Sequence, residues 1–239
     1  MQTVLITGAG RETGLGFETA RQLGRKGYHV ILAARRESQL QPLVERLKSE
    51  GTSASYVVLD ITSEDSAREV AGQIEREFGR LDVLVNNAAL MIGGQPVDEI
   101  PVDELRRIFD TNVIGTFNVT QKMLPLLRKS THARIVNVSS GAGSYDDPQY
   151  GFLHGMLGMT TLGYGMSKLA ENGMTIKLAQ ALASEHILVN SVCPDVTNTQ
   201  GAGFGRPVQE SAKSVVWAVE LPEDGPTGGF YRDGKALPW

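Results

Sequence analysis

The chain has 239 residues, of which 41% are hydrophobic and 21% are charged, and this balance excludes a disordered or collagen-like protein. A formal net charge of -4 offers no broad attraction to nucleic acid or to an anionic membrane, so we expect neither as a partner. The single cysteine, Cys193, excludes an intramolecular disulfide and a cysteine-rich zinc site, which favours a cytoplasmic protein with no metal centre.

The first predicted strand runs from Thr3 to Ile6 and leads into the glycine-rich loop TGAGRETGLG, from Thr7 to Gly16. Such a turn, placed between a strand and a helix, lets the backbone approach a pyrophosphate while the helix N-terminus offers free NH groups. A turn with no ligand is the alternative explanation. The candidate phosphate-binding residues of this loop are Gly8, Gly14, Leu15 and Gly16.

The second predicted strand, His29 to Ala33, is followed by the pair Arg35 and Arg36. A dinucleotide site carries here either an acid for the ribose of NAD or an Arg for the ribose phosphate of NADP. Because the acid is missing and two guanidinium groups can bind a phosphate in bidentate fashion, the pair favours NADP(H). Arg11 of the glycine-rich loop adds a third positive charge, with a solvated loop arginine as the alternative. We assign Glu37 to the first turn of the next helix.

Apolar runs of strand length alternate with longer amphipathic segments along the whole chain. The runs lack internal polar alternation, which is typical of strands buried on both faces of a parallel sheet. We therefore predict an α/β fold in a single domain over residues 1–239, with a Rossmann-type doubly wound parallel sheet of about seven strands flanked by helices. The clearest strands are Thr3 to Ile6, His29 to Ala33, Ser55 to Leu59, Leu81 to Val85, Arg134 to Val138 and Ile187 to Val192. The clearest helices are Phe17 to Lys26, Ser38 to Glu50, Ser63 to Phe78, Val102 to Arg128 and Ser167 to Ser184.

Neither a signal peptide nor a membrane span is expected. The first residues include no basic stretch followed by a long apolar segment. No window approaches the roughly 18 consecutive apolar residues that a span requires. Two irregular stretches, Gly141 to Gly163 and Pro194 to Pro207, follow strands at the edge of the sheet where ligands bind, and we predict that they form pocket walls.

The next candidate is Tyr164-Gly165-Met166-Ser167-Lys168. On a helix, positions i and i+4 share a face, so the Lys168 ammonium can lie near the Tyr164 hydroxyl. A nearby cation favours the phenolate and lowers the pKa of the tyrosine, which suits a general acid or base. An isolated motif of this kind is more often a surface helix pair.

In combination, these motifs resemble the short-chain dehydrogenase/reductase family, and the resemblance covers essentially the whole chain. The closing segment, from Gly225 to Trp239, is particularly similar to the NADPH-dependent carbonyl reductases of that family. The motifs occur in the family's order: Thr7-Gly8 with Gly14-Leu15-Gly16, Asp60, Asn86-Asn87-Ala88-Ala89, Asn112, Ser139-Ser140, Tyr164 with Lys168, and Asn190-Ser191-Val192-Cys193-Pro194.

The resemblance implies catalytic roles for four residues. Tyr164 would protonate a carbonyl oxygen while C4 of the nicotinamide delivers hydride to the carbon. Lys168 would lower the Tyr164 pKa and bind the nicotinamide ribose, and Ser140 would orient the carbonyl, with Ser139 as the alternative. Asn112 would lie within a helix and hold a water that relays protons to Lys168; independently of the resemblance, a mid-helix Asn indicates local disruption.

The resemblance also assigns cofactor contacts. Asp60 would contact the adenine amine, Asn87 would line the adenosine ribose, and Thr199 would reach the pyrophosphate or carboxamide. Helix capping is the alternative for Asp60, and a strand-end turn is the alternative for Asn87. The complete predicted cofactor set is Gly8, Arg11, Gly14, Leu15, Gly16, Arg35, Arg36, Asp60, Asn87, Lys168, Pro194 and Thr199.

Three departures from the family pattern concern the walls of the expected site. Five residues separate Gly8 from Gly14, more than the family places there, and we expect the extra residues to bulge into solvent and to turn Arg11 toward phosphate. The alternative is a loop that occludes the site. An insertion that contains residues 144–148 lengthens the stretch before Tyr164, as in the carbonyl reductases, and Asp195 stands where the family has glycine.

The sequence thus predicts an NADPH-dependent reductase of ketones or aldehydes whose partner is a small-molecule carbonyl substrate. One alternative is a 3-oxoacyl thioester reductase, although the basic patch that would bind a phosphopantetheine carrier is missing between Gly141 and Phe204. The other is a nucleotide-sensing protein without turnover. The family's dimers and tetramers suggest a homo-oligomer, and a monomer is the outcome if the insertion covers those faces.

Overall fold

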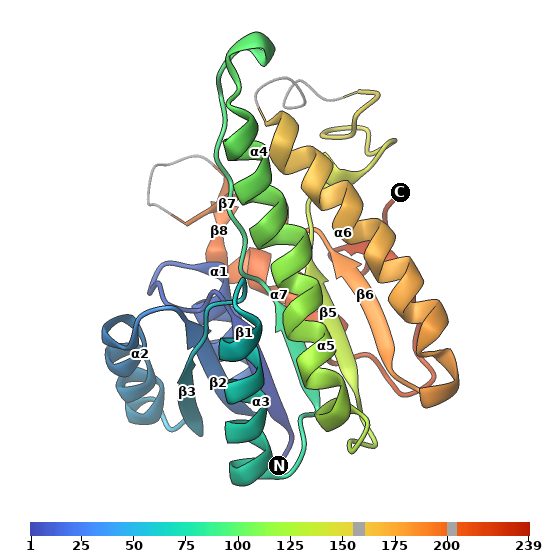
Figure 1. Cartoon of the computed structure of the whole chain (residues 1–239). Helices are drawn as coiled ribbons and strands as arrows, with labels where there is room; N and C mark the ends of the chain where they lie inside the picture. The colour runs from blue at the N-terminus through green and yellow to red at the C-terminus, as the bar shows by residue number, and fades with distance from the viewer. Residues whose placement is uncertain (155–160, 200–204) are drawn as a thin grey trace.

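The computed structural model describes residues 1–154, 161–199 and 205–239, and it consists of one large sheet between two layers of helices (Figure 1). The strands of the sheet are β1 (Thr3–Thr7), β2 (His29–Ala34), β3 (Ala54–Val58), β4 (Val83–Asn86), β5 (Arg134–Val138), β6 (Leu188–Val192), β9 (Phe230–Arg232) and β10 (Lys235–Ala236). The short strands β7 (Thr197–Asn198) and β8 (Arg206–Pro207) pair separately. The helices are α1 (Leu15–Arg25), α2 (Glu37–Ser49), α3 (Glu64–Phe78), α4 (Val102–Phe109), α5 (Thr116–Leu127), α6 (Leu162–Ala181) and α7 (Val208–Val219). Short helical turns are η1 (Val97–Glu99), η2 (Asp110–Gly115), η3 (Gly141–Gly143) and η5 (Ala183–Glu185).

The strand order in the sheet is β10-β9-β6-β5-β4-β1-β2-β3. All pairings are parallel except that of β10, which runs antiparallel to β9 at one edge. The chain order reverses on either side of β1, as a doubly wound sheet requires. The predicted Rossmann-type sheet is confirmed, with β10 as an antiparallel addition.

Both faces of the sheet are buried, which explains the uninterrupted apolar strands. In β1, Val4 and Ile6 pack into the core beneath α1, α2 and α7, whereas Leu5 between them packs into the core beneath α3, α5 and α6. All three side chains are fully buried. Successive side chains of a strand point to opposite faces, so each strand serves two cores and fixes the helices on both sides.

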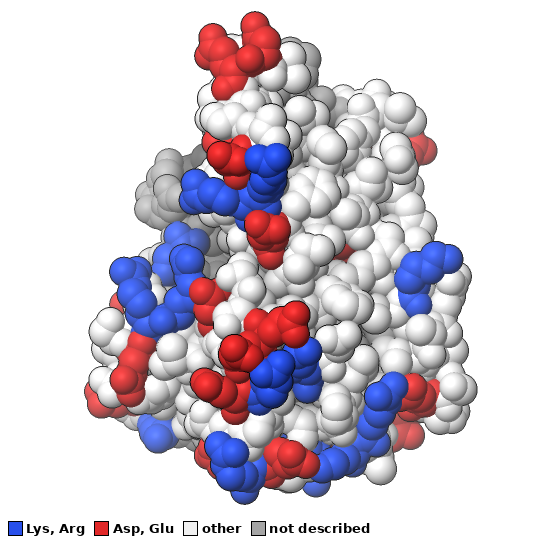
Figure 2. Space-filling view, viewed as in Figure 1, with Lys and Arg blue, Asp and Glu red and all other residues white. Residues whose placement is uncertain are grey.

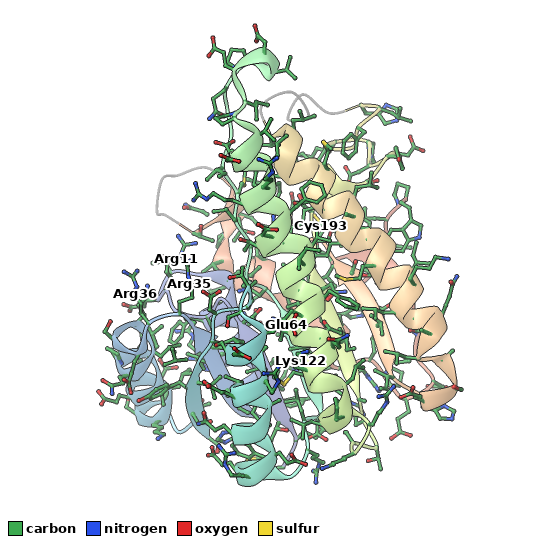
Figure 3. All side chains as sticks on the ribbon, in the orientation of Figure 1. Arg11, Arg35, Arg36, Glu64, Lys122 and Cys193 are labelled. Atoms are coloured by element: carbon green, nitrogen blue, oxygen red, sulfur yellow. The ribbon has the colours of Figure 1, made fainter. Side chains whose placement is uncertain are left out.

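Local signals determine where helices start and stop. The hydroxyl of Ser63 accepts a hydrogen bond from the Ser66 NH at the start of α3, and Gly79 ends the same helix with a φ of 73°. Lys122 of α5 reaches Glu64 of α3 at 3.3 Å, a partly exposed ion pair that links two helices of one layer (Figure 3).

Two predicted helices differ from the structure in ways that affect the site. The predicted helix over 102–128 is interrupted by a π-helical turn, η2, which contains Asn112. The predicted helix over 167–184 begins earlier, at Leu162, so Tyr164 lies in its first turn. The sequence patterns did not predict α7 or the hairpin of β9 and β10. No described helix is both long and apolar enough to cross a membrane.

Candidate active site

A cleft of about 1400 Å³ opens beyond the carboxyl ends of the strands. It is lined by the glycine-rich loop, by the segments that follow β2, β4, β5 and β6, and by the start of α6. Of the predicted site residues, those that line the cleft are Gly8, Arg11, Gly14, Leu15, Arg35, Arg36, Asp60, Asn87, Ser140, Tyr164, Lys168, Pro194 and Thr199. Gly16 and Asn112 lie behind its walls. One cleft therefore brings together segments from almost the whole chain.

The glycine-rich loop packs against the end of β4 so closely that two of its residues must lack a side chain. Gly8 has a φ of +68°, and a Cβ added there would lie 2.7 Å from the Ala88 Cα. A Cβ on Gly16 would lie 2.6 Å from the Asn87 Nδ2. The same Nδ2 donates to the Thr7 main-chain oxygen at 2.8 Å. Asn87 thus holds the loop in place, and bare backbone faces the cleft.

The extra residues of the loop are fixed outside the cleft. Gly14 NH donates to the Arg11 main-chain oxygen at 3.0 Å, which closes a tight turn. Glu12 forms an ion pair with Arg46 of α2. The Thr13 hydroxyl donates to the Thr199 main-chain oxygen at 2.7 Å, joining the loop to the opposite wall. The lengthened loop therefore leaves the cleft open, unlike the occluding loop considered as the alternative.

Three arginines form the basic end of the cleft, which we define as Arg11, Arg35 and Arg36. Their side chains are exposed and lie together above α2 (Figures 2 and 3). Within residues 1–154, 161–199 and 205–239, no acid pairs with any of the three guanidinium groups. The neighbouring acid Glu37 accepts a hydrogen bond from the Tyr56 hydroxyl at 2.6 Å instead. The basic end is therefore available to an anion.

Other predicted cofactor residues line the cleft but also serve the fold. The Oδ1 atom of Asp60 accepts hydrogen bonds from the NH and the hydroxyl of Thr62, at 3.0 and 2.7 Å, in a turn before α3. The N-cap of α3 is Ser63, so Asp60 does not have the capping role considered for it. The Pro194 main-chain oxygen accepts from the Arg206 Nε at 2.9 Å. These contacts fix the two residues at the cleft wall.

At the other end of the cleft, Ser140, Tyr164 and Lys168 meet. The Ser140 hydroxyl acts on Tyr164 and lowers the pKa of its hydroxyl, and the Lys168 Nζ lies 5.7 Å from the centre of the Tyr164 ring. Lys168 also donates to the Val138 main-chain oxygen at 2.7 Å. In the described part of the chain the hydroxyl of Ser139 has no partner, so Ser140 is the serine that contacts the tyrosine.

The position of Ser140 follows from how closely η3 packs on α6. A Cβ on Gly143 would lie 2.6 Å from the Lys168 main-chain carbon, so only glycine permits this approach. Asn172 of α6 donates to the Gly143 main-chain oxygen at 3.0 Å. The Ser140 oxygen accepts a hydrogen bond from the Ala142 NH at the start of η3. The serine is therefore held by a rigid turn.

Glu171, which the sequence analysis did not single out, forms an ion pair with Lys168. The Lys168 Nζ lies 2.6 Å from the Glu171 Oε2, and the two side chains are 2% and 1% exposed. The sequence signal is an acid three residues after the lysine, a spacing that places both on one helix face. Such spacing is common on helix surfaces, and only the burial distinguishes this pair.

Burial controls the proton affinity of these groups. Desolvation of its hydroxyl raises the pKa of Tyr164 above the ordinary value, and the Lys168 ammonium opposes this only in part. Tyr164 is partly exposed and lines the cleft. Burial would lower the pKa of Lys168, but Glu171 and Tyr164 outweigh it and raise that pKa. Lys168 thus acts on Tyr164 in the expected direction, and burial exceeds its effect.

Asn112 contributes through the π-helical turn rather than through the cleft. Its Oδ1 accepts from the Leu90 NH at 2.7 Å, and its Nδ2 donates to the Leu90 oxygen at 3.0 Å and to the Ser167 hydroxyl at 2.9 Å. The side-chain amide is thus committed to the segment after β4 and to α6. A water held by Asn112 would have to bind its main-chain oxygen, a group that π-helical turns can release from helical bonding.

Tyr150 and Asp195 form the outer wall beside Tyr164. Asp195 has a φ of 63°, and its Oδ1 accepts hydrogen bonds from the Val196 NH at 2.7 Å and from the Tyr150 hydroxyl at 3.1 Å. Aspartate tolerates this left-handed conformation because its side chain binds the adjacent backbone. Burial and the Asp195 carboxylate raise the pKa of Tyr150 to about 12.

The insertion before Tyr164 is folded against the C-terminal segment. The Ser144 hydroxyl donates to the Pro238 main-chain oxygen at 2.8 Å, and the Tyr145 NH donates to the Trp239 oxygen at 2.9 Å. The fully buried Asp147 accepts from Arg232 of β9 at 2.6 Å. Residues 155–160 and 200–204 of the two predicted pocket walls lie outside the described residues.

Comparisons with known proteins agree with this geometry. The chain is 35% identical over 228 residues to the short-chain dehydrogenase anuI of Penicillium roqueforti, which covers 90% of this chain and 87% of the relative. It is 31% identical over 276 residues to carbonyl reductase (NADPH) 1 of Mus musculus, with 98% and 97% covered. The solved RhlG/NADP active-site complex of Pseudomonas aeruginosa superposes with a TM-score of 0.81 at 27% identity, covering 98% of this chain and 95% of that one.

The short chain dehydrogenase family model matches residues 2–207, and the chain therefore belongs to the short-chain dehydrogenase family of oxidoreductases.

Proposed function

We propose that the protein is an NADPH-dependent reductase that converts ketones or aldehydes to alcohols. The observation that carries the proposal is a single cleft with Ser140, Tyr164 and Lys168 at one end and the unpaired basic end at the other. The similarity to a carbonyl reductase named for NADPH supports the choice of substrate and cofactor. The single cysteine supports a cytoplasmic location, and we take residues 1–239 as one domain.

The described residues fit a dinucleotide phosphate. The glycine-rich loop presents bare backbone to the cleft at Gly8 and Gly14. Behind it, a Cβ on Gly8 or Gly16 would collide with the end of β4. At the end of β2, Arg35 and Arg36 would bind the ribose phosphate, with Arg11 as a third cation. Asp60, Asn87, Pro194 and Thr199 would complete the adenosine and pyrophosphate walls, and Lys168 would bind the nicotinamide ribose.

The chemistry would follow from three side chains. When bound, NADPH supplies the hydride that is added to the carbonyl carbon. The Tyr164 hydroxyl donates its proton to the carbonyl oxygen, and Ser140 holds that oxygen by a hydrogen bond. The Lys168 ammonium stabilises the phenolate that remains, and Asn112 holds a water that returns a proton through Lys168. Because burial raises the Tyr164 pKa, the hydroxyl keeps its proton at neutral pH, which suits reduction.

The substitution Tyr164→Phe tests the proposal. Reduction of carbonyl compounds, followed as loss of NADPH absorbance with a panel of ketones, aldehydes and quinones, should fall by about 10²- to 10⁴-fold. The affinity for NADPH, followed by nicotinamide fluorescence, should stay within twofold, because the phenol is not a phosphate ligand. Tyr145→Phe, at an exposed tyrosine, is the matched control and should leave both unchanged. Unchanged turnover in Tyr164→Phe would remove the assigned role.

The quaternary structure also belongs to the proposal. We infer a homo-oligomer, a dimer or a tetramer, formed through the long helices. Light scattering coupled to size exclusion gives the mass directly, and a mass of 25.8 kDa would identify a monomer.

A further inference from the structure

Glu171 has no part in the mechanism above, although its ion-pair partner Lys168 does. The two form the most deeply buried ion pair among the described residues, with 1% of the Glu171 side chain and 2% of the Lys168 side chain exposed. The exposed pair of Glu210 and Lys213 on α7 has the same two residue types three positions apart, with side chains that are 52% and 63% exposed. A surface pair of that kind contributes little, whereas a buried carboxylate acts on its neighbours with little screening by water.

Glu171 also restricts where the ammonium of Lys168 can point. An ammonium has three NH donors. Among the described residues, the Val138 oxygen accepts one at 2.7 Å and the Glu171 carboxylate accepts another at 2.6 Å. One donor is left for the cleft, and the ammonium is held 5.7 Å from the Tyr164 ring centre. The carboxylate therefore fixes the orientation of the group that acts on the tyrosine.

The sign of the electrostatic effect follows from this arrangement. When Tyr164 or Lys168 loses a proton, its charge becomes more negative. The buried Glu171 carboxylate beside them repels the added negative charge and therefore raises the pKa of both groups. Other titratable and charged groups of neighbouring elements line the same cleft as Tyr164 and Lys168: Cys193 after β6, Arg107 of α4 and Asp110 of η2. Of these, Cys193 acts on both Tyr164 and Lys168. None of these three is in contact with the Lys168 ammonium within the described residues, and η3, which packs on α6, has no charged side chain.

We propose that Glu171 is a positioning residue that holds the Lys168 ammonium and raises the pH at which the pair of Tyr164 and Lys168 releases its first proton. The inference rests on the proposed function, because the pair matters for catalysis only if Tyr164 is the acid. Its consequence is an active site that keeps the tyrosine protonated into the alkaline range and so favours the reductive direction. A Gln at this position would keep the shape and one hydrogen bond but remove the charge.

The test compares Glu171→Gln with Glu210→Gln, which removes a charge of the same type from the exposed pair. Tyrosinate absorbance at alkaline pH is recorded for each protein and for the same protein carrying Tyr164→Phe, so that the difference isolates Tyr164 from the other tyrosines. In Glu171→Gln we expect the first proton of the pair to be lost at least about one pH unit lower than in the wild type. The alkaline limb of kcat/KM for carbonyl reduction should move by the same amount. Glu210→Gln should coincide with the wild type.

The outcomes separate the possible roles. A lower melting temperature with unchanged midpoints would show that Glu171 only neutralises a buried lysine, and it would overturn the inference. A shifted absorbance titration in a protein that reduces no carbonyl compound would uphold the inference and contradict the proposed function. If Glu171→Gln does not fold, Glu171→Asp is the second variant, because it withdraws the charge by one methylene. The pH midpoint of the tyrosinate titration should then shift in the same direction by a smaller amount. An unchanged midpoint in Glu171→Asp would also overturn the inference.

Discussion

At the scale of single residues, the preference for one cofactor over another depends on charges that the fold leaves unpaired. Arg35 and Arg36 follow β2 directly, and Arg11 reaches the same end of the cleft because Glu12 and Thr13 are fixed elsewhere. A guanidinium group that has no internal partner loses no ion pair when it binds a phosphate. Discrimination between NADPH and NADH should therefore lie in these side chains.

The substitutions Arg35→Leu and Arg36→Leu should each weaken NADPH binding and leave NADH binding nearly unchanged. A hydrogen bond to a charged group contributes about 1.5–3 kcal/mol, which corresponds to roughly a 10- to 150-fold rise in the Kd for NADPH. Titrations of nicotinamide fluorescence measure both cofactors on the same protein. Arg68→Leu, at an exposed arginine of α3 that does not line the cleft, is the control. Equal losses for both cofactors would mean that the arginines do not contact the ribose phosphate.

Residues of the site differ in how far the sequence predicts them. Gly8 belongs to a glycine pattern that a tight backbone turn requires, and Tyr164 belongs to a spacing that places two side chains on one face of a helix. Their placement in one cleft could therefore be predicted. Glu171 could not be predicted, because an acid three residues after a lysine is also an ordinary surface pattern. The contact of Tyr150 with Asp195 joins positions far apart in the chain, and no local pattern encodes it.

At the scale of elements, the insertion and the C-terminal segment depend on each other. Residues 144–147 are held by Pro238, Trp239 and Arg232, and the ring of Trp239 stacks on Phe230 with centres 5.6 Å apart. Neither segment has enough apolar residues for a core of its own. The insertion is therefore ordered by the end of the chain rather than by its own sequence, which is why no helix or strand could be predicted there.

Deletion of Pro238 and Trp239 should destabilise the protein and release the insertion. The lost stacking and the two lost hydrogen bonds contribute about 2–4 kcal/mol together, which corresponds to a fall in Tm of about 4–16 °C for a chain of this size. Because Tyr150 lies in the same insertion and lines the cleft, the KM for a carbonyl substrate should rise as well. Calorimetry and steady-state kinetics measure the two effects. Trp239→Phe keeps an aromatic ring on Phe230 and should retain most of the stability; an unchanged Tm in the deletion variant would contradict the coupling.

At the scale of the whole molecule, the alternation of apolar and amphipathic segments was sufficient to predict the sheet and its helical layers. It failed where segments were short: β9 and β10 have three and two residues, and their place at the sheet edge depends on pairing with β6. The helix over 102–128 was predicted as one element with local disruption at the mid-helix Asn112, and the π-helical turn η2 contains that residue. Long-range pairing thus escapes local patterns, whereas the poor helix propensity of Asn112 indicated where the helix is disrupted.

Cofactor binding should stabilise the entire fold, because the cleft is lined by segments from the first strand to the loop after β6. At an NADPH concentration of about 100 times the Kd, linkage gives about 2.7 kcal/mol of added stability, or roughly 5–11 °C in Tm. NADH at the same concentration should give a clearly smaller rise. In a variant that carries both Arg35→Leu and Arg36→Leu, NADPH and NADH should raise the Tm by equal amounts. A larger rise with NADPH in that variant would indicate another phosphate ligand.

The aromatic cluster at the edge of the sheet determines what intrinsic emission can report. The chain has two tryptophans, and both pack against β9: Trp217 lies 4.9 Å from the Tyr231 ring, and Trp239 stacks on Phe230. A denaturation curve followed by tryptophan emission therefore describes the detachment of this edge, whereas ellipticity averages over all helices. If the edge separates before the central strands, the emission midpoint will precede the ellipticity midpoint, and a two-state fit to either curve alone will misjudge the stability of the molecule.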